Sequence, residues 1–146
     1  MNVQEIMAMN PTCCTPDTNL RDVARLMCDG DCGEIPVVES LKTMKLIGVV
    51  TDRDITCRAV AAGRNPLELN ARDCMSTPVV TVTAETTIEE CCDVMETKQI
   101  RRVPVIDRSG SCCGIVSQAD LARHAPYRQS AELLEKVSQP AKAASA

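Results

Sequence analysis

Two short motifs place a hydroxyl side chain three residues before a carboxylate. They are Thr51-x-x-Asp54 and Ser117-x-x-Asp120, and each directly follows an apolar run with β-branched residues. Such a pair suits the start of a helix, where the free first-turn amides and the positive end of the helix dipole attract anionic groups. The same pattern is also an ordinary helix cap, in which the acid accepts hydrogen bonds from backbone amides. The motifs taken alone therefore allow either a binding site or a cap.

The elements that carry these motifs occur twice in the chain. Residues 46–55 and 112–121 each have the pattern of a buried strand that runs directly into a helix. Strand patterns over residues 35–39 and 103–107 precede them, in each case beside a proline. This order of elements predicts that the second half of the chain is a copy of the first.

A helix is predicted ahead of the strands in each half, because apolar residues recur there at helical spacing. The two sets lie 68 positions apart: Leu20, Val23, Ala24 and Met27, then Ile88, Cys91, Cys92 and Met95. We expect Thr86 and Glu89 to form a capping box at the second helix, and Asp17 or Thr18 to cap the first. The spacing places Cys91 and Cys92 on the buried face.

The predicted fold is α/β, with two repeats of the order β-α-β-β-α. Repeats of roughly 60 residues are too small to bury their sheets alone, so we expect them to pack on each other about a pseudo-twofold axis. In the C-terminal tail we expect a short amphipathic helix over residues 129–138 and disorder over residues 139–146. The predicted segments are residues 1–63 for the first repeat, 64–70 for a linker, 71–126 for the second repeat and 127–146 for the tail.

Composition argues against several classes of function. The net charge is −4 and Tyr127 is the only aromatic residue, so a nucleic-acid partner is not expected. No apolar run approaches the roughly 20 residues of a membrane span, and the first residues lack a secretion signal, so we expect a cytoplasmic protein with no membrane partner. No nucleophile stands beside a recognisable base, and His124 is the only histidine, so we expect no catalytic residues and a protein that is not an enzyme.

Ten cysteines are present, and we expect most of them to be reduced thiols. None of the adjacent pairs Cys13-Cys14, Cys91-Cys92 and Cys112-Cys113 has the Cys-x-x-Cys spacing of a zinc site or of a thioredoxin-like centre. The favoured interpretation is that the cysteines are small buried hydrophobes, with no metal ligands among them.

The repeated elements resemble tandem cystathionine beta-synthase (CBS) domains, the pair called a Bateman module. The resemblance is carried by residues 35–38 and 48–54 in the first half, and by residues 101–107 and 114–120 in the second. It covers about residues 1–126 and implies a stand-alone CBS-pair protein of bacterial type, without an attached kinase, channel or dehydrogenase domain.

The resemblance implies a sensor that binds an adenosine-containing ligand between the repeats, namely AMP, ADP, ATP or S-adenosylmethionine. Thr51 and Asp54 would then hold one ribose, and Ser117 and Asp120 the other, since a carboxylate can accept hydrogen bonds from both ribose hydroxyls. The resemblance further implies a flat homodimer and, because no effector domain is attached, a signal that passes to a separate partner protein.

Cationic residues precede the second strand of only one repeat. Arg101 and Arg102 stand where the first repeat has Gly33 and Glu34. In the family such residues commonly face the phosphates of a nucleotide whose ribose is held by the other repeat, a task that suits the forked donors of arginine. We therefore expect the stronger site to consist of Thr51, Arg53, Asp54, Arg101 and Arg102.

The site at Ser117 and Asp120 is expected to be weaker, or to suit a less charged ligand such as an adenosyl thioether. With no aromatic residue nearby, adenine would lie between aliphatic or sulfur side chains. By position, the candidates are Cys13, Ile35, Val80 and Val103.

Two alternatives to nucleotide sensing stay open. One is a thiol-based redox or metal sensor that uses the same fold. The other is a structural scaffold in which both motifs are helix caps and no ligand binds.

Overall fold

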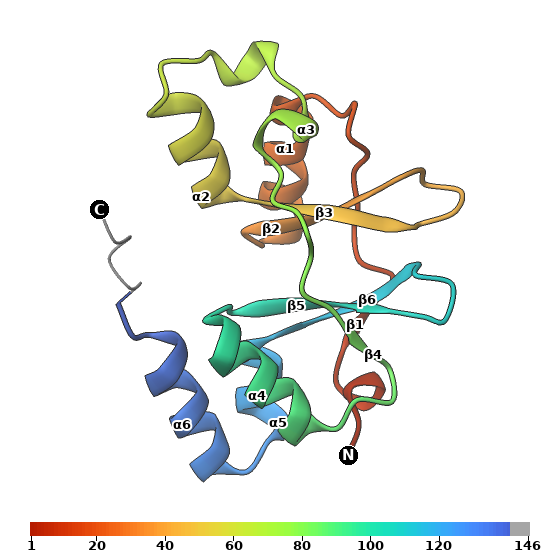
Figure 1. The fold of residues 1–146 in the computed structure, drawn as a ribbon, viewed down its shortest axis with the longest axis vertical. Coiled ribbons are helices and arrows are strands. Elements are labelled where there is room, and N and C mark those ends of the chain that lie inside the picture. The colour runs from red at the N-terminus through yellow and green to blue at the C-terminus, as the bar shows by residue number, and fades with distance from the viewer. Residues whose placement is uncertain (141–146) are drawn as a thin grey trace. The chain divides into compact units, whose positions relative to one another are not determined.

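The computed structural model describes residues 1–140. The chain forms two compact units, which do not follow one another along the sequence. We call them the first-repeat unit (Asn10–Val80 with Ile106–Cys113) and the second-repeat unit (Met1–Met9, Thr81–Val105 and the chain from Gly114). Figure 1 shows the elements of each unit.

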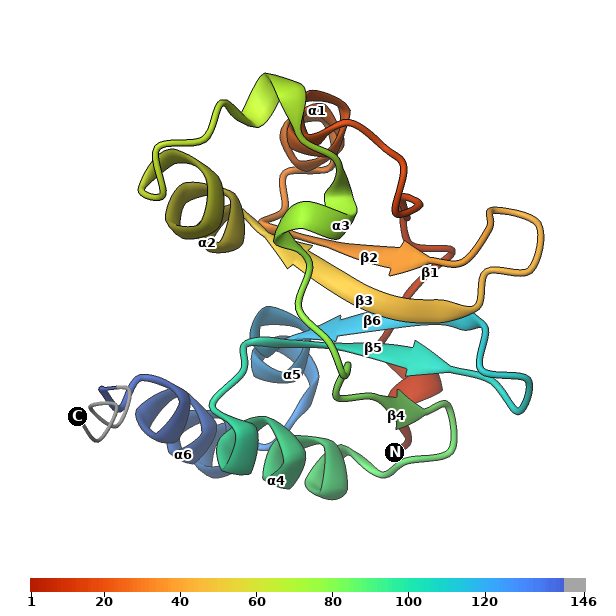
Figure 2. The same ribbon diagram turned by 45° about the horizontal axis from the view of Figure 1, so that its top comes forward.

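The first-repeat unit is built on an antiparallel pair of strands, β2 and β3. Glu34 pairs with Thr51 and Val37 pairs with Gly48. Helices α1 and α2 lie on the same side of this pair (Figures 1 and 2). The elements of the unit are α1 (Leu20–Gly30), β2 (Glu34–Val38), β3 (Leu46–Thr51), α2 (Asp52–Ile55), a π-helical turn (Thr56–Val60), a 3-10 turn (Pro66–Glu68) and α3 (Ala71–Cys74).

The core of this unit forms where the apolar face of α1 meets the strands. Leu20, Val23 and Met27 are buried as the helical spacing predicts, and they belong to one cluster with Ile35 and Val50. Alternation along the strands directs these apolar side chains toward the helix and thereby fixes the register of the strand pair.

The second-repeat unit holds a sheet with the strand order β1-β6-β5-β4. Helices α4 and α5 lie on one side of β5 and β6 (Figures 1 and 2). The elements are a 3-10 turn (Val3–Glu5), β1 (Ala8–Met9), β4 (Val82–Thr83), α4 (Ile88–Lys98), β5 (Arg102–Ile106), β6 (Cys112–Ser117), α5 (Gln118–His124) and α6 (Tyr127–Val137).

The N-terminal residues belong to the second-repeat unit because they pair with it. Ala8 lies opposite Ile115 in an antiparallel ladder, and the Val3 amide donates to the carbonyl of Thr86 over 2.8 Å. The helix expected in the tail is present as α6, while residues 141–146, part of the segment predicted to be disordered, lie outside the described residues.

The predicted caps of α1 and α4 were wrong by one or two residues. The cap of α4 is Thr87, whose hydroxyl accepts from the Glu90 amide over 3.2 Å, because the Thr86 hydroxyl instead accepts from the Thr83 amide over 3.0 Å. Asn19 caps α1 in place of Asp17 or Thr18.

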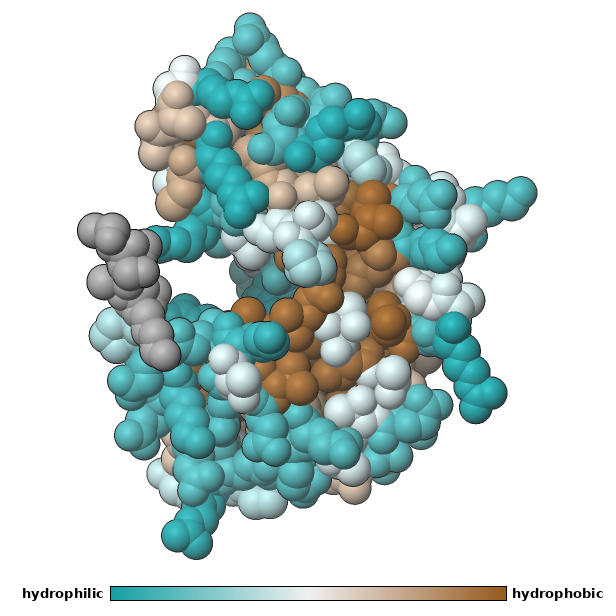
Figure 3. All heavy atoms as spheres, in the orientation of Figure 1, coloured by the Kyte–Doolittle hydropathy of each residue, from teal (hydrophilic) through white to brown (hydrophobic). Residues whose placement is uncertain are grey.

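The outward faces of α4 and α6 are hydrophilic, and apolar side chains gather over the strands (Figure 3). Across residues 1–140, none of the helices has the length and apolar character needed to cross a membrane.

Candidate functional site

The motif of the first-repeat unit lies where β3 runs into α2. The Thr51 hydroxyl accepts from the Asp54 amide over 3.0 Å, and Asp54 Oδ2 accepts from the Thr51 amide over 2.9 Å, so the two residues form a capping box. The other oxygen, Oδ1, lies 3.9 Å from Nε of Arg58, and the Asp54 side chain is 17% exposed. Arg58 is held elsewhere, because its Nη1 donates to the carbonyl of Met75 over 2.9 Å.

The motif of the second-repeat unit has the same cap at the junction of β6 and α5. The Ser117 hydroxyl accepts from the Asp120 amide over 3.2 Å, and Asp120 Oδ2 accepts from the Ser117 amide over 2.8 Å. Asp120 Oδ1, however, accepts a hydrogen bond from Nη2 of Arg123 over 2.6 Å. Both oxygens of Asp120 are therefore engaged within the unit.

In each unit the residue just before β2 or β5 accepts a hydrogen bond from the first residue of the helix that follows the next strand. The amide of Asp52 donates to the Gly33 carbonyl over 2.9 Å, and the amide of Gln118 donates to the Arg101 carbonyl over 2.8 Å. Arg101 and Arg102 thus lie in the same unit as Ser117 and Asp120. The predicted combination of these arginines with Thr51, Arg53 and Asp54 draws on both units and stays a prediction.

Gly33 leaves room for the carboxylate of Asp52, a residue that the sequence analysis did not predict to be part of the site. A Cβ at this position would lie 2.9 Å from Oδ2 of Asp52, and Asp52 Oδ1 in turn accepts from the Arg53 amide over 2.8 Å. The absence of a side chain at Gly33 therefore lets the first acid of α2 fold back over its own helix start.

The four side chains proposed to contact adenine differ in accessibility. Ile35 and Val103 are fully buried in strands β2 and β5, whereas Cys13 and Val80 are partly exposed and belong to the first-repeat unit. Their shared role in an adenine site stays a prediction, with Cys13 and Val80 the better placed to reach a ligand.

The sequence missed Arg58 and Arg123, although a signal for them exists. Each follows its motif acid by one helical turn, at i+4 and i+3, where opposite charges meet on a helix face. The sequence shows that each acid has an arginine one helical turn later. It does not show that Arg58 lies 3.9 Å from Asp54 whereas Arg123 lies 2.6 Å from Asp120.

The cysteines are free thiols, and the interpretation as small buried hydrophobes holds for several of them. Cys91 and Cys92 on α4 are buried as predicted, and burial raises the pKa of Cys91 to about 12 and that of Cys92 to about 11. Among residues 1–140, no group of three His, Cys, Asp or Glu side chains is placed to hold a metal ion.

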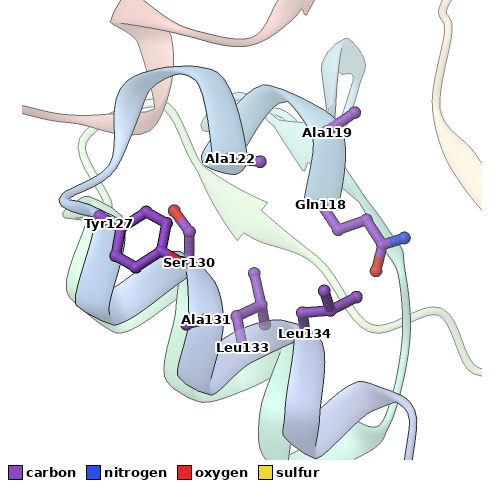
Figure 4. Close-up of a pocket in the computed structure, with 8 residues that line it drawn as sticks. All are labelled: Gln118, Ala119, Ala122, Tyr127, Ser130, Ala131, Leu133 and Leu134. Carbon is purple, nitrogen blue, oxygen red and sulfur yellow. The ribbon is translucent and has the colours of Figure 1, made fainter.

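A pocket of about 360 Å³ lies between α5 and α6 of the second-repeat unit (Figure 4). Its lining is mostly apolar, but Oε1 of Gln118 is buried and has no hydrogen-bond partner within the described part of the chain. The pocket did not emerge from the sequence because α5 and α6 form it only when they pack together. The lining residues are Gln118, Ala119, Ala122, Tyr127, Ser130, Ala131, Leu133 and Leu134.

Comparison with known proteins identifies the family. The model of the CBS domain matches the chain twice, over residues 3–59 and 71–127. The chain belongs to the CBS-domain family. The resemblance is thus confirmed, together with the α/β fold class and the two repeats. CBS-pair proteins of this kind are typically regulatory.

Two relatives show how far this CBS pair resembles known proteins. Hypoxic response protein 1 of Mycobacterium tuberculosis is 34% identical over 137 residues, which is 94% of either chain. Protein MK0525 of Methanopyrus kandleri is 32% identical over 127 residues, which is 87% of this chain but 64% of MK0525. The CBS pair thus spans nearly all of one relative and somewhat under two thirds of the other.

Solved structures share the fold. The crystal structure of Hypoxic Response Protein I with two coordinated zinc ions is 36% identical, has a TM-score of 0.78, and is matched over 86% of this chain and 100% of that one. The CBS pair of MJ0100 in complex with 5-methylthioadenosine and S-adenosyl-L-methionine is 23% identical, with a TM-score of 0.75 over 84% and 98% of the two chains. CBSX2 in complex with AMP is 21% identical, with a TM-score of 0.74 over 85% and 95%.

Proposed function

We propose that this CBS pair is a cytoplasmic regulatory module that binds an adenosine-containing nucleotide and signals to a separate protein. Thr51 and Asp54 are the proposed ribose contacts. The observation that carries this choice is the state of the Asp54 carboxylate, whose Oδ1 lies 3.9 Å from Nε of Arg58, whereas Asp120 Oδ1 accepts a hydrogen bond from Arg123 over 2.6 Å. A ribose hydroxyl can bond this oxygen without breaking the capping box on Oδ2.

The ligand class is supported by similarity of fold. MJ0100 and CBSX2 are CBS proteins whose structures hold 5-methylthioadenosine with S-adenosyl-L-methionine, and AMP, respectively. Arg53, Arg101 and Arg102 are proposed to face the phosphates, because arginine donors match phosphate oxygens. We expect AMP, ADP or ATP to bind more tightly at Thr51 and Asp54 than at Ser117 and Asp120.

The proposal treats the chain as a homodimer that changes its shape or partner surface when nucleotide binds. It also assigns no role to a metal. Sedimentation velocity with and without AMP checks the first point, and elemental analysis of the purified protein checks the second, since a structure of Hypoxic Response Protein I holds zinc.

Calorimetric titration of the reduced, nucleotide-free protein with AMP, ADP, ATP and S-adenosylmethionine tests the function. We expect Asp54→Asn to lower the affinity at least tenfold, a loss of at least about 1.4 kcal/mol. Asparagine has one acceptor oxygen in place of two, so it cannot accept from the Thr51 amide as Oδ2 does and also offer a second oxygen to the ribose. Asp120→Asn is the matched control at the other motif and should change the affinity less. Absence of heat with every ligand, and of any rise in melting temperature at high ligand concentration, would refute nucleotide binding.

A further inference from the structure

Two cysteines far apart in the sequence meet in the first-repeat unit. Cys13 lies in the extended segment that follows β1, and Cys112 is the first residue of β6, a strand whose first two residues belong to the first-repeat unit. The Cys112 thiol hydrogen-bonds the sulfur of Cys13, so the two side chains are in direct contact.

Main-chain hydrogen bonds hold both cysteines in place. Next to Cys13, the amide of Cys14 donates to the Pro36 carbonyl over 3.0 Å, and the amide of Val38 donates to the Cys14 carbonyl over 2.8 Å. The amide of Cys112 donates to the Met44 carbonyl over 2.8 Å. Both segments are thus fastened to the β2–β3 hairpin, which keeps the thiols together.

The two thiols differ in exposure, so an oxidant can reach one of them more readily than the other. Cys13 is partly exposed, whereas Cys112 is 4% exposed. The hydrogen bond from Cys112 lowers the pKa of Cys13, while burial raises the pKa of neighbouring Cys14 to about 11. Cys13 is therefore the thiol of the pair that an oxidant can reach, Cys112 is the buried thiol in contact with it, and burial keeps Cys14 in the core.

We propose that Cys13 and Cys112 form a reversible intramolecular disulfide when the protein meets a peroxide. The Cys13 thiolate attacks one peroxide oxygen, the O–O bond breaks, and the hydroxide that leaves takes up a proton to become water. The Cys112 sulfur then attacks the resulting sulfenic acid, the S–O bond breaks, and the released hydroxide takes the Cys112 proton. In balance, two thiols and one hydrogen peroxide give one disulfide and two waters.

A dithiol reductant reverses the reaction, because its thiolate attacks the disulfide through a mixed intermediate. Reversible disulfides of this kind are the form in which cytosolic proteins use such bonds. The proposal does not depend on nucleotide binding, so it can hold or fail independently of the proposed function.

The direct test treats the reduced full-length protein with about equimolar hydrogen peroxide, blocks the remaining thiols with N-ethylmaleimide, and maps the peptides by mass spectrometry. We expect a peptide that links Cys13 to Cys112, lost after dithiothreitol. Adding dimedone, which reacts with sulfenic acids, lets the same peptide mapping detect the intermediate. The adduct should appear at Cys13 and should accumulate in the Cys112→Ser variant.

Matched variants separate this pair from general thiol oxidation. Cys28→Ser and Cys57→Ser remove exposed thiols and should leave the linked peptide unchanged, whereas Cys13→Ser should abolish it. Disulfides that join two chains, a preferred link between other cysteines, or a stable dimedone adduct at Cys13 in the wild-type protein would overturn the proposal. Because the linked peptide is sought in the wild-type protein, poor folding of a variant does not remove the test.

Discussion

The two hydroxyl–acid motifs share one residue pattern and one capping geometry, yet their carboxylates are in different states. Oδ1 of Asp54 lies 3.9 Å from Nε of Arg58, whereas Oδ1 of Asp120 lies 2.6 Å from Nη2 of Arg123 and is bonded to it. Arg58 is drawn away because its guanidinium donates to the carbonyl of Met75 beyond α3. The comparison teaches that the motif determines the backbone at a helix start, while residues one turn later determine whether the acid can accept a ligand.

The chain after each motif differs as well. In the first-repeat unit α2 continues as the π-helical turn Thr56–Val60, whereas in the second-repeat unit α5 is followed by α6. Helix α6 packs on α4 and α5, and Lys136 Nζ donates to Glu96 Oε2 over 3.1 Å. The second-repeat unit therefore carries a helix that has no counterpart in the first.

Truncating Leu133, the buried leucine that packs α6 onto its unit, should produce the largest change in the free energy of unfolding. Leu133 is 1% exposed and Leu134 is 57% exposed on the same helix. We expect Leu133→Ala to lower the free energy of unfolding by roughly 2–5 kcal/mol, because it leaves a cavity in the packed face. Leu134→Ala should change it by less than about 0.5 kcal/mol. Urea unfolding measures both, and equal losses would show that α6 is not docked as the structure has it.

Alkaline pH should destabilise the protein in part through α4, where Cys91 and Cys92 occupy the positions of Val23 and Ala24 in α1. The unfolded thiols lose their protons above their ordinary pKa of 9.0, but the folded ones hold theirs until about 12 and 11. The unfolded state then binds fewer protons, so stability falls as the pH rises through this range, by at most about 1.4 kcal/mol per pH unit for each thiol.

Replacing Cys91 and Cys92 by the residues at the matching positions of α1 tests whether these thiols cause the loss of stability at alkaline pH. The double variant Cys91→Val with Cys92→Ala should show a flatter decline of unfolding free energy between pH 9 and pH 11, measured by urea unfolding in reducing buffer. Cys28→Ser, an exposed position, serves as the control and should keep the wild-type slope. An unchanged slope in the double variant would contradict the assignment.

A small change in stability, but the most informative change in ligand binding, is expected from Arg123→Ala. The ion pair with Asp120 is at the surface, with the Arg123 side chain 65% exposed, so its loss should cost less than about 1 kcal/mol. The variant frees Asp120 Oδ1 and should raise the affinity or the number of nucleotides bound, as seen by calorimetry. Arg123→Lys keeps the charge and is the control; identical binding by all three proteins would mean that Arg123 does not limit the second site.

Much of the local structure was predictable because short-range rules determine it. The repeat, the strands, the buried faces of α1 and α4, and the caps at Thr51 and Ser117 follow from periodicity and from hydrogen bonds within one turn. The cap of α4 was misplaced because Thr86 and Thr87 are each followed three residues later by an acid. Only the turn that engages the Thr86 hydroxyl with Thr83 distinguishes them.

The sequence by itself determined the family, the order of elements and the candidate motifs, since each depends on residues close together in the chain. Tertiary structure alone decided that Met1–Met9 joins the second-repeat unit, that Arg58 turns away from its acid, and that Cys13 touches Cys112. The physical reason is common to all three. Each outcome depends on contacts between distant segments, and no local pattern of residue types encodes the distance between two side chains that meet only when those segments pack.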